Sequence, residues 1–288
     1  MKIVCTMPAR NEDWILGLSL RAVLGWADSV VILDHASTDR TPDIIAEVSA
    51  EHPGRVISLH EPDPCWAEMA HRQRLLEAAR REGATHIAIV DADEVLTGNL
   101  IPRIRGEFER LMPGSVLQLP WLMCWRSRDQ YRNGDASVWS QNWVSCGFVD
   151  APHLHWRARD GYDFHHRHPM GRELSPARPV ARVAGGILHL QHASWRRLIA
   201  KQCLYGLTEL IRWPGRKSAR EISQMYGGTV DETGIRYSSI PAAWWAPYAG
   251  LMQYLHVDAE PWQEAECRRL MAEHGREKFA GLNLFGVV

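Results

Sequence analysis

Two aspartates, Asp91 and Asp93, directly follow an apolar run at residues 87–90. Such a run predicts a buried strand, and in open parallel sheets ligands bind beyond the carboxyl ends of the strands. Carboxylates two positions apart at such an end can share a divalent cation and leave room for phosphate oxygens. The catalytic centre is therefore predicted around Asp91 and Asp93. The alternative is that Asp91 ends a strand and Asp93 caps a helix.

Two earlier segments have the same place relative to predicted strands. Residues 8–12 follow the first strand, where backbone and small side chains can approach a nucleotide. Asp34 ends the second strand, where its carboxylate could accept a hydrogen bond from a base N–H or a ribose hydroxyl. Alternatively, Asp34 is a turn residue bonded to its own backbone. Ser37, Thr38 and Asp39 are expected to cap the next helix.

The order and spacing of these three segments resemble family 2 glycosyltransferases over roughly the first hundred residues. The resemblance implies a GT-A fold, a UDP- or GDP-sugar donor, transfer of a hexose-like sugar, and a Mn²⁺ or Mg²⁺ ion. It also implies that Asp34 contacts the nucleoside and that Asp93 binds the metal, with Asp91 nearby. The residues of the first segment expected at the donor are Pro8, Arg10, Asn11 and Glu12. The family commonly has Asp-Asp-Gly-Ser where this chain has Asp-His-Ala-Ser at 34–37, which leaves the donor base open.

A second cluster, residues 185–192, resembles the segment after the sheet in some bacterial family 2 enzymes, where a histidine completes the metal site. A neutral imidazole is a reasonable third ligand for Mn²⁺ beside Asp91 and Asp93. His189 is the expected ligand, because it ends an apolar run that would return to the sheet. His192 is expected to lie beside the metal ligands without binding the ion itself.

The segment 156–182 is rich in arginine and histidine. It is interpreted either as a loop that covers the diphosphate or as a solvated basic loop. Inversion at the sugar carbon needs a carboxylate that deprotonates the acceptor. Asp163 is the preferred general base because it lies beside the histidines of this segment. The other candidates are Asp150, Asp160 and Glu173.

The acceptor is expected to be a saccharide or a lipid-linked molecule. Several tryptophans lie between the metal motif and the histidine cluster, and a minority of them are expected to line the acceptor groove. These are Trp121, Trp125, Trp139, Trp143 and Trp156. Residues 244–248, with two tryptophans and a tyrosine, predict either packing onto the sheet domain or a peripheral membrane contact.

The elements that must position these residues alternate along the first hundred residues. Strands are predicted at 2–7, 30–33, 55–59 and 86–90, and helices at 11–26, from 41, and at 66–81. This alternation predicts an α/β fold, a Rossmann-like, doubly wound and mostly parallel sheet. Helices at 194–211 and 262–275 predict a mainly helical C-terminal region. The expected domains are residues 1–190 and 191–288.

The composition is that of a folded protein, with 45% hydrophobic and 23% charged residues among 288. A formal net charge of −1 gives no reason to expect nucleic acid as a partner. Six dispersed cysteines and an N-terminus that enters a strand at once predict reduced thiols and a cytoplasmic location.

Two alternatives to an active glycosyltransferase remain, a nucleotidyltransferase and an inactive sugar-nucleotide or glycan-binding relative. The first usually needs a Gly-rich loop after its first strand, and no glycine precedes Gly17.

Overall fold

The computed structural model describes residues 1–134, 141–162, 166–171 and 173–288. The chain forms two compact units, each built from separate stretches of sequence. The sheet unit contains residues 1–122, 142–189 and 240–256, and the helical unit contains 123–141, 190–239 and 257–288. The predicted boundary at residue 190 marks one passage between the units, but residues 240–256 return to the sheet unit.

The sheet unit has one curved sheet in the strand order β3-β2-β1-β4-β8-β6-β10-β5, with β9 beside β6. The strands β1, β2, β3 and β4 are parallel, and β8 is antiparallel to both β4 and β6. This confirms the predicted α/β fold with a mostly parallel sheet. The strands are β1 Ile3–Ala9, β2 Ser29–His35, β3 Val56–Glu61, β4 His86–Ile89, β5 Glu94–Leu96, β6 Ser115–Met123, β8 Trp143–Val149, β9 Ser175–Ala177 and β10 Ile187–His189.

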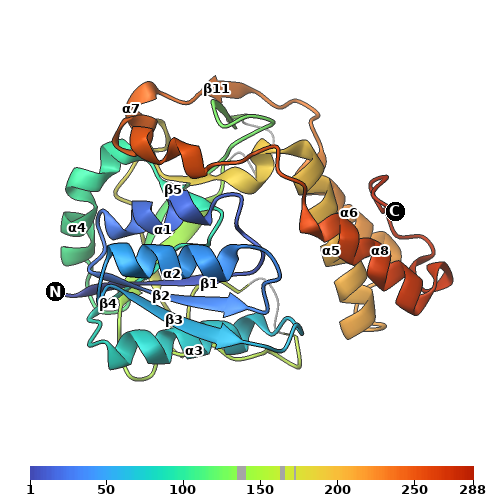
Figure 1. Ribbon diagram of the computed structural model, residues 1–288, viewed down its shortest axis with the longest axis horizontal. Coiled ribbons are helices and arrows are strands. Elements are labelled where there is room, and N and C mark those ends of the chain that lie inside the picture. Colours follow the sequence, from blue (N-terminus) through green and yellow to red (C-terminus); the bar gives the residue numbers. More distant parts are fainter. Residues whose placement is uncertain (135–140, 163–165, 172) are drawn as a thin grey trace. The chain divides into compact units, whose positions relative to one another are not determined.

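Helices cover both faces of the parallel half (Figure 1). Side chains alternate across a strand, so Ile3, Cys5 and Met7 of β1 pack on one face and Val4 on the other. The first face is covered by α1 (Leu16–Leu24), α2 (Thr41–Glu51) and α4 (Ile101–Glu109), and the second by α3 (Glu68–Arg81). The apolar runs of β1 and β2 are continuous because both of their faces are buried.

Two short strands lie beyond the end of β4: β5, which was not predicted as a strand, and β10, which is the apolar run expected to return to the sheet before His189. The turn at 91–94 reverses the chain into β5, which pairs antiparallel with β10 so that Glu94 is opposite His189. Gly186 enters β10 so close to β6 that a Cβ there would lie 2.2 Å from the carbonyl oxygen of Pro120. Any side chain at Gly186 would push β10 off β6.

Residues 240–256 complete the sheet unit with α7 (Ala242–Trp245) and the 3₁₀ helix Ala246–Tyr254. Trp244 and Tyr248 are buried, and the Tyr248 hydroxyl donates to the Leu96 carbonyl oxygen at 2.7 Å. A Cβ at Gly17 of α1 would lie 2.9 Å from Cβ of Tyr254. The rings of Trp244 and Tyr248 therefore pack inside the sheet unit, which is the first of the two roles predicted for residues 244–248.

The helical unit consists of α5 (Trp195–Arg212), α6 (Ala219–Val230) and α8 (Trp262–His274), with β7 (Gln130–Arg132) paired to β11 (Tyr237–Ser239). Ser194 caps α5 by accepting from the Arg197 N–H. The helices α5 and α8 confirm the two helices predicted in the C-terminal region. Leu204 and Leu207 of α5 pack on Leu270 and Met271 of α8. Within the described part of the chain, no helix combines the length and apolar character needed to span a bilayer.

Candidate active site

The loops after β1 and β2 are tied together at the carboxyl edge of the sheet. Pro8 and Ala9 pair with Leu33 and Asp34, so both strands end side by side. Four hydrogen bonds then join the loops: Asn11 N to Ser37 Oγ (2.9 Å), Thr38 N to Asn11 Oδ1 (2.7 Å), Glu12 N to Thr41 Oγ1 (2.8 Å) and Asp13 N to Asp39 Oδ2 (3.1 Å). Ser37, Thr38 and Asp39 were expected to cap α2; Ser37 and Thr38 instead bond to Asn11, and Asp39 bonds both to the Asp13 N–H and to the start of α2.

At the start of α2, Asp39 makes a bond of the expected kind. The helix α2 begins at Thr41 itself, with Pro42 in its first turn, and no side chain caps it at the preceding Arg40. Asp39 Oδ1 accepts the Thr41 N–H at 2.8 Å, and Thr41 Oγ1 accepts from the Glu12 N–H. The predicted helix at 11–26 is correspondingly shorter, because residues 10–15 form the loop that lies at the sheet edge.

Asp34 is buried at the end of β2, with 3% of its surface exposed. Its Oδ1 accepts from the Ser37 N–H at 3.3 Å, and its Oδ2 lies 3.1 Å from Nδ1 of His60 on β3. The turn bond of the alternative interpretation is thus present. Ala36 adopts φ +47°, a left-handed conformation that favours glycine, and it occupies the position where the family pattern has glycine.

The loop between β3 and α3 is anchored to the same edge. Arg10 Nη1 donates to the Pro64 carbonyl oxygen at 2.6 Å, and His35 Nε2 lies 2.9 Å from the Asp63 carbonyl oxygen. The His35 ring packs on His71 of α3, with centroids 4.4 Å apart. Burial, assisted by the charge of His35, lowers the pKa of His71 to about 4, so His71 is neutral at neutral pH.

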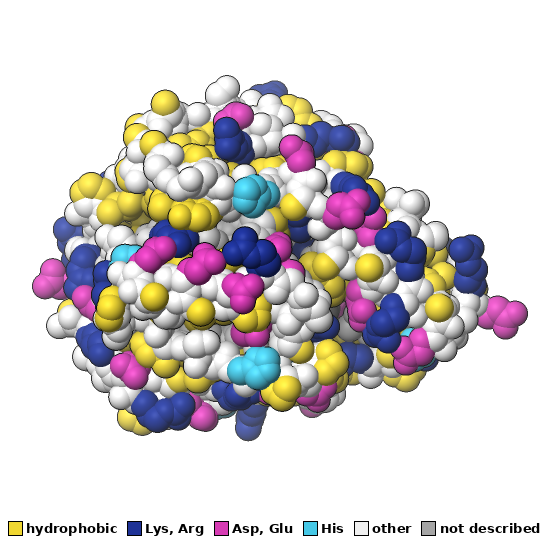
Figure 2. All heavy atoms as spheres, viewed as in Figure 1, with side chains coloured by type: hydrophobic (Ala, Val, Ile, Leu, Met, Phe, Trp, Pro, Cys, Tyr) yellow, Lys and Arg dark blue, Asp and Glu magenta, His cyan; other side chains and the backbone are white. Residues whose placement is uncertain are grey.

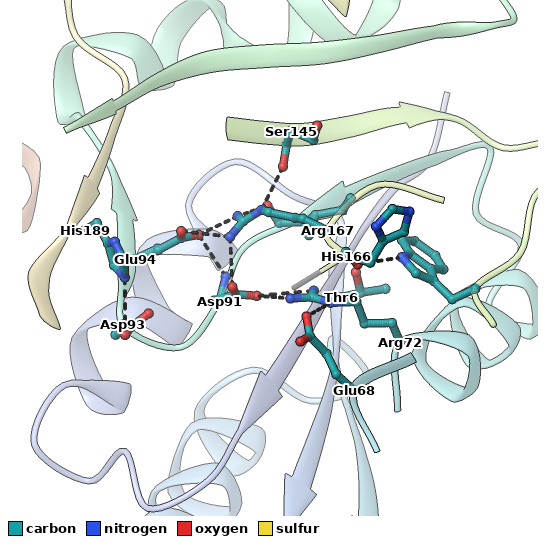
Figure 3. A network of polar contacts seen from close by, with 12 residues as sticks. Thr6, Glu68, Arg72, Asp91, Asp93, Glu94, Ser145, His166, Arg167 and His189 are labelled. Carbon is teal, nitrogen blue, oxygen red and sulfur yellow. Dashed lines mark hydrogen bonds and ion pairs between the residues drawn. The ribbon is translucent and has the colours of Figure 1, made fainter. Parts of the chain in front are cut away.

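Asp93 and His189 face each other beyond the end of β4 (Figure 3). Nε2 of His189 lies 3.5 Å from Oδ2 of Asp93, and both side chains are buried. Asp93 comes from the turn after β4 and His189 from the end of β10, so the sheet brings together residues 96 positions apart in sequence. This juxtaposition of Asp93 and His189 is the one that the predicted metal site requires.

Asp91 turns away from this pair and toward two arginines (Figure 3). Its Oδ1 accepts from Arg72 Nη2 of α3 at 3.3 Å, and its Oδ2 from Arg167 Nη1 at 2.8 Å. Burial acts to raise the pKa of Asp91, but the charges of Arg167 and Arg72 outweigh it and lower the pKa. Among the described residues, no group of three or more His, Cys, Asp or Glu side chains is placed to hold a metal ion. Of the three predicted ligands, Asp93 and His189 therefore lie together, and Asp91 lies apart from them against Arg72 and Arg167.

Glu94 is the site residue to which the sequence analysis assigns no role. It is fully buried and accepts from Arg167 Nη1 (2.8 Å), Arg167 Nη2 (2.5 Å), Trp121 Nε1 (2.8 Å) and the Asp91 N–H (3.0 Å). Burial acts to lower the pKa of Arg167, but the charges of Asp91 and Glu94 outweigh it and raise the pKa. The only signal in the sequence is an acidic residue at the start of a short apolar segment, 94–96.

The basic segment contributes Arg167 to this network, and its other described arginines lie elsewhere. Arg178 donates to Gln118, and Arg182 donates to the backbone oxygens of Trp121 and Asn142. A cavity of about 580 Å³ is lined by His155, Arg157, Ala158, Arg159, Asp160, Met170 and Gly171. These positions separate Arg167, which lies at the site, from Arg178 and Arg182, which bond to β6 and the start of β8.

The predicted general base, Asp163, lies outside the described residues, as does Trp139. Asp150 forms a two-bond ion pair with Arg80, and its N–H donates to the Thr85 carbonyl oxygen at the opposite edge of the sheet. Asp160 and Glu173 are exposed. Asp150 is therefore far from the carboxyl edge where Asp93 lies.

The tryptophans have separate roles. Trp125 is fully buried in the helical unit, where its ring stacks on His192 with centroids 5.8 Å apart. Trp156 is buried against Phe148 in the sheet unit. Trp121 is half-buried and stacks on His189, with centroids 4.5 Å and planes 9° apart. Of these rings, Trp121 is the one in contact with the Asp93–His189 pair.

No curated protein matches this sequence. Among solved structures, the chain is similar to S. aureus TarS 1–349, with 11% identity, 97% of this chain and 90% of that chain covered, and a TM-score of 0.44. The mannosyltransferase PcManGT from Pyrobaculum calidifontis, in complex with GDP-Man and Mn²⁺, has 13% identity over 96% of this chain and 75% of that one, with a TM-score of 0.42.

A third similar structure is glucosyl-3-phosphoglycerate synthase from Mycobacterium tuberculosis in complex with Mn²⁺, uridine diphosphate and phosphoglyceric acid. It has 22% identity over 42% of this chain and 43% of that chain, with a TM-score of 0.30. Residues 5–143 match the family model "Glycosyl transferase family 2", a range that contains the loop after β1, Asp34 and the Asp91–Glu94 turn. Over residues 5–143, just under half of its length, this chain is therefore similar to glycosyl transferase family 2.

Proposed function

We propose that this chain transfers a sugar from a UDP- or GDP-sugar to a saccharide or lipid-linked acceptor, with Mn²⁺ or Mg²⁺ held by Asp93 and His189. The observation that carries the proposal is the buried Asp93–His189 pair at the carboxyl edge of the sheet. The sequence that forms most of this sheet matches the family 2 glycosyl transferase model. A cytoplasmic location and an inverting reaction belong to the same proposal.

The pair fits a divalent ion by its atoms and their separation. A carboxylate oxygen and an imidazole nitrogen together suit Mn²⁺, whereas Mg²⁺ prefers oxygen ligands. Two ligand atoms, each about 2.1 Å from one ion, can lie up to roughly 4 Å apart, and these two are 3.5 Å apart. A bound ion would neutralise negative charge on the diphosphate as the sugar leaves.

We propose that Asp91 lies next to the bound donor and is not one of the principal metal ligands. Its two oxygens accept from Arg72 and Arg167, so binding an ion would require one oxygen to leave an arginine. The two guanidinium groups keep Asp91 ionised and bring positive charge close to the position proposed for the diphosphate.

The nucleoside is proposed to bind at the tied loops after β1 and β2. Pro8, Arg10, Asn11 and Glu12 border this edge, and Asp34 ends the neighbouring strand. The cross-links between residues 11–13 and 37–41 hold the loops in one conformation before a ligand arrives, which lowers the entropic cost of binding.

Asp163 is proposed as the base that removes the proton from the acceptor hydroxyl.

A membrane contact through Trp244 and Tyr248 is not part of the proposal, because both rings are buried. On the face drawn in Figure 2, acidic and basic side chains are interspersed, which gives an anionic membrane no broad basic surface there.

The decisive experiment measures thermal shifts with UDP- and GDP-sugars, each with and without Mn²⁺, together with metal-dependent hydrolysis of the donor that stabilises best. Asp93→Ala should abolish the Mn²⁺-dependent part of both signals. The matched control is Asp28→Asn, because Asp28 accepts from the Ile3 N–H at the opposite edge of the sheet. Asp28→Asn should change stability without changing the Mn²⁺ dependence.

Retention of normal metal-dependent turnover by Asp93→Ala would refute the assignment of the metal site. Donor binding without any hydrolysis or transfer, in the presence of Mn²⁺ and a range of saccharide acceptors, would instead favour the inactive relative. Formation of a sugar nucleotide from a sugar phosphate and a nucleoside triphosphate would favour the nucleotidyltransferase.

A further inference from the structure

Trp121 on β6 connects the Asp93–His189 pair to the arginine network. One face of its indole stacks on the His189 ring, with centroids 4.5 Å and planes 9° apart. Its Nε1–H donates to Glu94 Oε1 at 2.8 Å. Glu94 in turn accepts from Arg167 and from the Asp91 N–H. A single side chain therefore contacts one proposed ligand and the carboxylate that holds the neighbouring turn.

The stacked ring sets the direction of the His189 nitrogens. The torsion that rotates an imidazole about its Cβ–Cγ bond has broad minima, so burial alone does not fix the ring plane. A nearly parallel aromatic ring against one face restricts that rotation, because tilting the imidazole would open a gap or cause a clash. In this orientation His189 Nε2 points toward Asp93 Oδ2 at 3.5 Å.

The indole is itself held in place from two sides. Glu94 is fully buried and is fixed by the two Arg167 bonds and by the turn at 91–94, where the Glu94 N–H donates to the Asp91 carbonyl oxygen at 3.0 Å. On the other side, Gly186 lets β10 approach the Pro120 carbonyl oxygen directly before Trp121. His189 and Trp121 can therefore stack without displacing either strand.

We propose that Trp121 is a positioning residue for the metal site: it orients His189 by stacking, and Glu94 orients Trp121 by accepting its N–H. This inference rests on the proposed function, because it assumes that Asp93 and His189 bind the ion. Groups that orient metal ligands commonly change metal affinity by 10- to 100-fold when they are removed.

The test measures the affinity for Mn²⁺ from the electron paramagnetic resonance signal of the free ion, in parallel with saturating UDP and saturating GDP. Trp121→Leu, which removes both the ring face and the N–H, should weaken Mn²⁺ binding by about tenfold or more. Trp121→Phe keeps a ring against His189 and loses only the bond to Glu94, so its loss should be measurable but smaller, about threefold.

The matched control is Trp26→Leu. Trp26 is 5% exposed and stacks on Phe108, and it precedes β2 at the opposite edge of the sheet. This change should lower the melting temperature at least as much as Trp121→Leu, yet leave the Mn²⁺ affinity within about twofold of wild type. A purely structural role for Trp121 would make the two variants alike in both measurements.

The possible results separate the inference from the function on which it rests. If Asp93→Ala and His189→Ala lose Mn²⁺ binding while Trp121→Leu and Trp121→Phe keep wild-type affinity, Trp121 does not position the site. If Asp93→Ala binds Mn²⁺ as tightly as wild type, the proposed metal pair is wrong. Should Trp121→Leu fail to fold, Trp121→Phe decides, and a wild-type affinity in that variant overturns the proposal.

Discussion

At the scale of residues, the site is organised by the buried carboxylate Glu94 and the half-buried guanidinium of Arg167. Glu94 and Arg167 share two hydrogen bonds, and each also bonds to Asp91. Removing one partner of a buried ion pair leaves an uncompensated charge, which typically costs about 3–5 kcal/mol. Substitutions of Glu94 or Arg167 would therefore alter folding and function together.

Asp34 gives a prediction at this scale. Asp34→Ala should raise the Michaelis constant for the donor by roughly three- to tenfold, the effect of one lost hydrogen bond, and should lower kcat less. Asp34→Asn is the control, because an amide oxygen can still accept from the Ser37 N–H. Steady-state kinetics with the donor varied would decide. An unchanged Michaelis constant together with a lower melting temperature would show that Asp34 is only a turn residue.

At the scale of elements, the parallel strands were predictable, whereas the pairing of the short antiparallel strands β5 and β10 was not. The strands β1, β2 and β4 are apolar because helices cover both their faces, and such runs are visible in a sequence. Three residues are too few to show a period, so β5 left no signal, and β10 was visible only as an apolar run expected to return to the sheet. Their pairing joins residues 94 and 189, a contact that local sequence does not encode.

The same distinction applies to the candidate site. Asp93 and His189 were predicted from motifs at the ends of apolar runs, and the structure places them together. The burial of Glu94 was unpredictable, because a glutamate is rarely buried without a partner and its partner, Arg167, lies 73 positions away. Arg167 could not be distinguished by sequence from the other arginines of the basic segment.

The contact between β2 and α3 predicts a dependence of stability on pH. His71 has a pKa near 4 in the folded protein, below its ordinary value of 6.5, so the unfolded chain binds a proton that the folded chain does not. The free energy of unfolding should therefore fall as the pH drops from about 6.5 toward 4. Each pKa unit corresponds to about 1.4 kcal/mol, which gives a loss of roughly 3 kcal/mol.

This prediction is checked by urea unfolding at several pH values between 7.5 and 4.5. His71→Gln should flatten the slope relative to wild type, and the exposed His256→Gln should leave it unchanged. Equal slopes in all three proteins would mean that His71 is not protonated differently in the folded and unfolded states.

At the scale of the whole molecule, the sheet unit depends on a late segment of the chain. Residues 240–256 bury Trp244 and Tyr248, and the Tyr248 hydroxyl bonds to Leu96 at the end of β5. This segment therefore supports the strand that begins with Glu94. Its contribution to stability can be measured without touching any proposed ligand.

Tyr248→Ala should reduce the free energy of unfolding by about 3–5 kcal/mol, as large-to-small changes of buried aromatic residues do. The control is Met112→Ala, an exposed position of the same unit, which should change it by less than about 0.5 kcal/mol. Denaturant titration followed by circular dichroism provides the measurement. A loss below 1 kcal/mol for Tyr248→Ala would show that the sheet unit is complete without residues 240–256.

The discontinuity of the sheet unit also has a consequence for biosynthesis. A domain usually folds as a unit while the ribosome is still adding residues behind it. Here the last residues of the sheet unit are 240–256, so the unit lacks a part of its core until these residues have been synthesised, after most of the helical unit. During that interval the nascent chain has the surface that Trp244 and Tyr248 later cover open to solvent and to chaperones.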